Sequence, residues 1–314
     1  MERRTILTII LLFFLSAGAF AAGFYFDSFG GSDGTLLDTA WRLQSEGRFE
    51  AALFFFEEYL KSNPGSAYAY SGLAWSQFEL GRMDEAREHF EHALQLDPDQ
   101  ESAHRGLAFV NLYRKGFPEA IQEFDAAIAI DPNVPNAYSG KGWAYYVQNE
   151  FELAVESFNQ FFAVKEPRDI ATDISQGDAY YGLALSYLAL GENEAAKEPL
   201  NRARKLWEPS VNYEHINRRF ADIEISLIQA DYLTSGFSSV EQDIEHLLDT
   251  YPNECKVYWL VGWIYFNEEQ YEKSTYYLNI SSEENNCDYM TRPWIDSSTS
   301  MELLHQIELL QSTA

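Results

Sequence analysis

The stretch "MDEAREHFEHALQLDPD", residues 83–99, places Ala86, Phe90 and Ala93 at positions i, i+4 and i+7. In an α-helix this spacing puts the three side chains in one stripe along one face, which is the face that a helix buries. Pro98 then ends the helix, because proline has no backbone N–H and clashes with the preceding turn. The stretch therefore predicts an amphipathic helix with a defined end.

The same pattern recurs every 34 residues along the first half of the chain. Each copy follows another helical segment that ends at a turn containing glycine, where a positive φ costs little. Several residue types that keep one period predict an array of two-helix units. The residues that recur every 34 positions are Ala52, Ala86, Ala120 and Ala154; Phe56, Phe90, Phe124 and Phe158; and Pro64, Pro98 and Pro132. The turns contain Gly47, Gly81 and Gly116.

Over residues 33 to about 288 the sequence resembles the tetratricopeptide repeat (TPR) family. The family has a small residue where the first helix of a unit touches the second, and the chain has one at Ala40, Ala74, Ala108, Gly142, Ala184 and Gly262. The resemblance implies an all-α, right-handed solenoid of about seven helix-turn-helix repeats. The seven units are residues 33–66, 67–100, 101–134, 135–168, 177–210, 221–254 and 255–288.

The array is regular up to residue 168 and irregular after it. About eight extra residues, 169–176, precede the fifth unit, and about ten, 211–220, precede the sixth, so both are expected to lengthen first helices. The last segment, residues 289–314, is predicted to form a loop and then an amphipathic helix over 299–311. We expect this helix to cap the exposed end of the last repeat.

Residues 1–26 differ from the rest of the chain. Arg3 and Arg4 precede an uncharged apolar run, residues 5–26, which is long enough to cross a bilayer as a helix. Basic residues before the run and acidic residues after it predict a single-pass anchor with the N-terminus inside and the repeats outside the cytoplasm. The alternative is a signal peptide that is cleaved on export. In either case residues 27–32 form a linker to the array at 33–288.

Knowledge of the TPR family implies that the second, fifth, ninth, twelfth and thirteenth residues of each unit line a concave groove. In this chain many of those positions are aromatic, and exposed aromatic patches commonly bind partners. The rings could instead pack on one another as a ladder, and the sequence leaves both readings open. The candidate groove residues are Trp41, Tyr68, Trp75, Phe78, Phe109, Tyr113, Trp143, Tyr146, Tyr181, Trp259, Trp263 and Phe266.

The chain carries 49 acidic and 22 basic residues, a formal charge of −27, which disfavours nucleic-acid binding. We find no nucleophile motif, phosphate loop or metal-ligand cluster, so no enzyme, cofactor or metal is expected. The expected function is a membrane-tethered scaffold that binds a protein or peptide in the groove, for assembly of a membrane or envelope complex. The alternatives are a permanent structural subunit of a membrane complex or surface filament, and a glycan-binding module of an envelope export system.

Two other features bear on these expectations. Cys255 and Cys287, the only cysteines, stand at the start and just after the end of the seventh unit, where an antiparallel hairpin brings its two ends together. Outside the cytoplasm they could form a disulfide. A basic group, defined by Arg202, Arg204, Lys205, Arg218 and Arg219, could bind an anionic surface or could be a solvated helix end.

Overall fold

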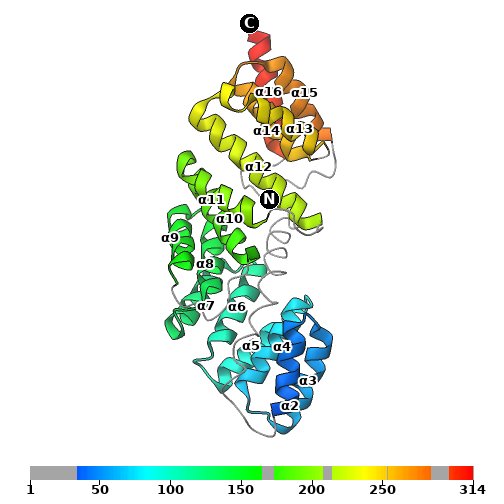
Figure 1. Cartoon of the computed structure of the whole chain (residues 1–314), viewed down its shortest axis with the longest axis vertical. Helices are drawn as coiled ribbons and strands as arrows, with labels where there is room; N and C mark the ends of the chain where they lie inside the picture. Colours follow the sequence, from blue (N-terminus) through cyan, green and yellow to red (C-terminus); the bar gives the residue numbers. More distant parts are fainter. Residues whose placement is uncertain (1–33, 165–172, 208–213, 253, 284–296, 314) are drawn as a thin grey trace. The chain divides into compact units, whose positions relative to one another are not determined.

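The computed structural model describes residues 34–164, 173–207, 214–252, 254–283 and 297–313, and all regular structure within those ranges is helical (Figure 1). The described residues form two compact units, 34–186 and 187–313, and the boundary falls inside helix α10. The helices are α2 (Gly34–Ser45), α3 (Phe49–Ser62), α4 (Ala67–Glu79), α5 (Met83–Leu96), α6 (Glu101–Tyr113), α7 (Phe117–Ile130), α8 (Pro135–Val147), α9 (Phe151–Ala163), α10 (Asp173–Ala189), α11 (Asn193–Leu206), α12 (Glu214–Ser235), η1 (Phe237–Ser239), α13 (Glu241–Thr250), α14 (Cys255–Asn267), α15 (Tyr271–Glu283) and α16 (Ser297–Thr313).

The order of these helices gives the predicted all-α solenoid of paired helices. In the first unit α2/α3, α4/α5, α6/α7 and α8/α9 pack as hairpins, and successive first helices also touch one another. The small residues expected at the hairpin contacts are fully buried, as Ala40, Ala74 and Ala108 show. The first helices of the fifth and sixth repeats are longer, as expected: α10 has 17 residues and α12 has 22, compared with 13 in α4.

The hairpin turns differ from the prediction in one repeat. Gly47 and Gly81 have positive φ, 72° and 75°, as expected. In the third repeat, however, Lys115 has the positive φ, 65°, while Gly116 has a φ of −81°. Lys115 is 34 residues after Gly81, so the repeat places the left-handed residue there and the glycine comes one position too late. The lysine accepts a conformation that costs a non-glycine residue roughly 1 kcal/mol.

Consecutive repeats pack against each other through a phenylalanine of one repeat and a glycine of the next. The four second-helix phenylalanines Phe56, Phe90, Phe124 and Phe158 are fully buried. Each ring lies against a glycine of the next first helix, so close that an added Cβ would be 2.4, 2.1, 2.3 and 2.3 Å from it. The four glycines, which were not predicted from the sequence, are Gly72, Gly106, Gly140 and Gly182.

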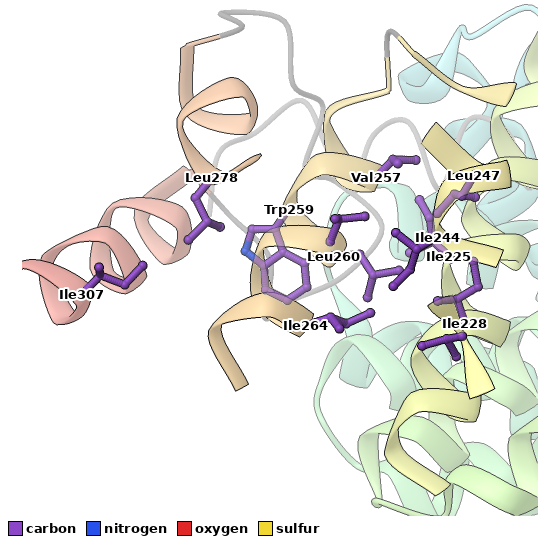
Figure 2. Packing of buried hydrophobic residues seen from close by; sticks show 12 residues of the cluster. Ile225, Ile228, Ile244, Leu247, Val257, Trp259, Leu260, Ile264, Leu278 and Ile307 are labelled. Carbon is purple, nitrogen blue, oxygen red and sulfur yellow. The ribbon is translucent and has the colours of Figure 1, made fainter. Parts of the chain in front are cut away.

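The second unit, residues 187–313, has its own hydrophobic core. Figure 2 follows this core from Ile307 on α16 through Leu278 on α15 and Leu260 on α14 to Ile244 and Ile225. Helix α16 packs mainly on α15, and Ile307 is almost fully buried there. Helix α16, Ser297–Thr313, includes residues 299–311, where the sequence predicted a helix.

Several expectations fall outside the described residues. They are the anchor or signal segment at 1–26, the linker at 27–32 and most of the loop from 289 onward. Among the residues that are described, the structure contains no helix with the length and apolar character needed to cross a bilayer.

Candidate partner-binding face

In the first unit, every fourth residue of each first helix falls on one face, because residues four apart are neighbours on a helix surface. We call the residues at the fifth, ninth and thirteenth positions of the first four repeats the first-helix face. Successive first helices of this unit contact one another. The face consists of Leu37, Trp41 and Ser45; Ser71, Trp75 and Glu79; Arg105, Phe109 and Tyr113; and Ser139, Trp143 and Val147.

The predicted aromatic groove is mostly buried. The expectation of exposed rings is wrong for eight of the twelve candidates, and the partner-binding role of the set remains a prediction. The half-buried members are Tyr68, Tyr113, Trp263 and Phe266. The buried members are Trp41, Trp75, Phe78, Phe109, Trp143, Tyr146, Tyr181 and Trp259.

The ninth-position rings are buried because each meets the phenylalanine of its own second helix. The ring centroids are 5.1 Å apart for Trp41–Phe56, 5.4 Å for Trp75–Phe90, 5.0 Å for Phe109–Phe124 and 5.6 Å for Trp143–Phe158. All four pairs meet edge to face, a geometry that aromatic rings favour. The two residues of each pair are 15 apart in the sequence, a spacing that could have signalled the contact.

Polar groups between α4 and α6 hold this part of the face rigid. Trp75 Nε1 donates to Ser102 Oγ at 2.9 Å, and Ser71 Oγ donates to the same hydroxyl at 3.0 Å. The guanidinium of Arg105 lies 5.2 Å from the centre of the Trp75 ring, while its Nε donates to Glu101 Oε1 at 2.8 Å. Cation–π stacking and a charge-assisted hydrogen bond thus fix Arg105, which is only 4% exposed.

The face becomes more accessible toward the C-terminal ends of its helices. At the thirteenth positions Ser45 is exposed, and Glu79, Tyr113 and Val147 are half-buried. Glu79 is the only acid of these four, and its Oε1 is shut off from solvent with no hydrogen-bond partner. Desolvation raises the pKa of Glu79 to about 8. Glu79 was not among the predicted groove residues, because that prediction rested on the aromatic residues at the groove positions.

We predict that Glu79 makes the stability of the first unit depend on pH. Its folded pKa of about 8 lies above the ordinary glutamate value of 4.5, so the folded state holds this proton more tightly than the unfolded state does. Stability is therefore lost as pH rises between those values. Glu79→Gln should unfold almost like the wild type at pH 5 and be more stable by roughly 1–3 kcal/mol at pH 9, because glutamine carries no negative charge whose desolvation opposes folding.

Urea unfolding at both pH values, monitored by circular dichroism, measures this difference. Glu88→Gln is the matched control because Glu88 is exposed on the neighbouring helix α5. A Glu79→Gln variant that tracks the wild type at every pH would contradict the prediction.

Three of the candidate groove residues, Trp259, Trp263 and Phe266, lie in the second unit. Trp259 and Trp263 stack with their centroids 6.1 Å apart and their planes at 10°. Trp263 also meets Tyr232 of α12 edge-on at 5.5 Å. Close to the start of α14, Lys256 Nζ pairs with Asp222 Oδ1 at 2.9 Å, and both side chains are largely buried. The aromatic side chains of this region pack on one another as part of the unit's core.

The remaining sequence candidates have ordinary structural surroundings. Arg202 pairs with Glu198, and Arg204 lies 3.4 Å from Glu224, so acids neutralise part of the basic group. The described residues contain no group of three or more His, Cys, Asp or Glu side chains arranged to hold a metal ion. Cys255 is disulfide-bonded and 4% exposed. Cys287 lies outside the described residues, so the pairing itself stays a prediction.

Family models for the tetratricopeptide repeat match residues 43–109, 106–163 and 178–208. These segments are tetratricopeptide repeats. The matches fall on α2–α9 and on the segment that contains α10 and α11, as the 34-residue period indicates. A comparison with curated proteins found no match.

Several solved structures share the TPR fold. PilW, described as a widely conserved type IV pilus biogenesis factor, aligns with a TM-score of 0.57 and 20% identity, covering 73% of this chain and 98% of PilW. PilF of Pseudomonas aeruginosa aligns with a TM-score of 0.53 and 17% identity over 76% and 96% of the two chains. YrrB, described as a TPR protein with an unusual peptide-binding site, aligns at 0.52 and 14% over 64% and 95%. At these identities the likeness concerns the fold alone.

Proposed function

We propose that this TPR protein is a membrane-tethered scaffold, displayed outside the cytoplasm, that holds a protein partner for assembly of a membrane or envelope complex. The observation that carries the proposal is the first-helix face. Its ninth-position rings and polar groups are fixed by buried contacts, while its thirteenth positions remain partly open. A preorganised face of this kind loses little entropy when a partner binds.

The solved relatives support the scaffold part of the proposal. The TPR fold is typical of protein-interaction scaffolds, and the description of YrrB names a peptide-binding site. PilW is described as a pilus biogenesis factor, which is an assembly role. We extend the same kind of role to this chain, with a segment of another protein as the ligand.

The membrane part rests on the apolar run at residues 5–26 and on the charges around it. The tether would confine the search for a membrane partner to two dimensions. A chain without residues 1–26 should leave the membrane fraction under alkaline washing, whereas the full chain should stay.

The structure bears differently on the two alternative functions, a permanent structural subunit and a glycan-binding module. A permanent structural subunit would also use the first-helix face, but it would co-purify with its partner at fixed stoichiometry. The glycan alternative depended on open aromatic rings for sugars to stack on. Most of those rings are buried, so that alternative has lost its supporting observation.

Site-specific crosslinking in membranes tests the partner-binding proposal. A photoreactive residue replaces Tyr113 or Val147 on the first-helix face, or Phe54 as the control. Phe54 is 56% exposed on the second helix α3. We expect protein adducts, identified by mass spectrometry, from positions 113 and 147 and not from 54. Adducts at equal yield from all three positions, or from none, would overturn the proposal.

A further inference from the structure

Glu79 is in an unfavourable position for a carboxylate, and the rest of the face does not compensate it. The residue is the last of α4, where the backbone carbonyls give the helix end partial negative charge. Its Oε1 is both inaccessible to water and without a hydrogen-bond partner. Two arginines of the neighbouring helix α6 and its turn are paired with other acids, Arg105 with Glu101 and Arg114 with Asp84.

The residue is nevertheless placed where a partner could reach it. It lies one helical turn beyond Trp75 on the same face, and its side chain is only half-buried. The corresponding residues of the neighbouring repeats, Ser45, Tyr113 and Val147, are uncharged. Among the four thirteenth-position residues, Glu79 is therefore the single acid. A buried polar group that the fold leaves unsatisfied needs an explanation, and a bound ligand group is one.

From this geometry we propose that Glu79 is the subsite for a cationic side chain, a lysine or arginine, of a protein segment that binds the first-helix face. A cation beside the accessible part of this side chain would neutralise the carboxylate and offset the repulsion from the end of α4, even though Oε1 itself is covered. The overall charge of −27 attracts basic partners over longer distances. The raised pKa of Glu79 agrees with a carboxyl group that lacks its counter-ion. This inference rests on the proposed function and adds the chemistry of the ligand to it.

A random-peptide display selection on the full-length protein in detergent tests the subsite. The selection is carried out in parallel on the wild type, on Glu79→Gln and on the exposed control Glu88→Gln. We expect the wild type and the control to select peptides with a lysine or arginine at one position, and Glu79→Gln to lose that preference. The neutral glutamine removes a desolvated charge, so loss of the preference cannot be attributed to unfolding.

A double-mutant cycle then quantifies the contact. The leading basic peptide and its lysine-to-norleucine analogue are titrated against the wild type and Glu79→Gln. The basic peptide should lose about tenfold or more in affinity for the variant, since a buried charge-assisted contact is worth about 1.5 kcal/mol or more. The norleucine peptide should bind the two proteins equally.

The outcomes separate this inference from the proposed function. The wild type and Glu79→Gln could select the same peptides, with no basic position or with neutral donors in its place. That outcome would overturn the cationic subsite and leave the scaffold proposal standing. Selection of no peptide by any of the three proteins would overturn both.

Discussion

Phe124→Ala is expected to lower the free energy of unfolding of the first unit by about 3–5 kcal/mol, the usual cost of emptying a buried aromatic site. The Phe124 ring is fully buried and joins three helices. It extends from α7, meets Phe109 of α6 edge-on at 5.0 Å and lies against Gly140 of α8. The cavity would thus weaken a hairpin and the contact between two repeats together. Urea unfolding followed by circular dichroism measures the loss.

Gly140→Ala tests whether the ring and the glycine act as one contact. The added Cβ would be 2.3 Å from the Phe124 ring, so the single variant should lose roughly 1–3 kcal/mol by overpacking. In the Phe124→Ala background the tight contact that remains is Phe109 Cε1 at 3.0 Å, so the glycine change should cost clearly less than in the wild type. Phe54→Ala serves as the surface control. Additive losses, or a loss below about 1 kcal/mol for Phe124→Ala, would show that this ring does not hold the repeats together.

Breaking the disulfide of Cys255 is expected to destabilise the second unit by roughly 3–4 kcal/mol, the loop-entropy value for a closed loop of about 33 residues. Cys255 is disulfide-bonded at the first residue of α14, and Cys287 is the only other cysteine in the chain. The bond would tie the start of α14 to the segment after α15. Opening it enlarges the unfolded ensemble, so the urea midpoint of this unit should fall when dithiothreitol is added.

The double variant Cys255→Ser, Cys287→Ser is the control, because its midpoint should not respond to reductant. Peptide mapping without reduction should recover residues 255 and 287 in one crosslinked fragment. Native protein whose two thiols both react with iodoacetamide before reduction would contradict the pairing.

The helices and their pairing were predictable because the signals that set them are short-range. Ala86 and Phe90 fix the face of one helix by their spacing alone, and Pro98 fixes its end. The period of 34 then carries the same arrangement to the neighbouring repeats. The left-handed turn at Lys115 shows the limit of single-residue reasoning, because the repeat decided the backbone conformation and the nearby glycine did not.

The candidate site was only partly predictable, because exposure depends on contacts between helices that are distant in sequence. Trp75 occupies a groove position of the family, which suggested an open ring. In the structure Phe90 of the second helix and Phe109 of the next repeat cover it, and Ser102 accepts its N–H. Glu79 was not predicted, because it looks like an ordinary surface acid in its local sequence and only the packed structure shows that it is desolvated.

By itself, therefore, the sequence determined the all-helical repeat, its period and the faces along which its hairpins close, since each depends on residue spacing within a few helical turns. Only the tertiary structure decided which groove residues remain accessible. The rings at the ninth positions are buried by partners 15 or 34 residues away, and the carboxylate of Glu79 is left without one. Burial is a property of the packed array, because each repeat completes the surface of its neighbour.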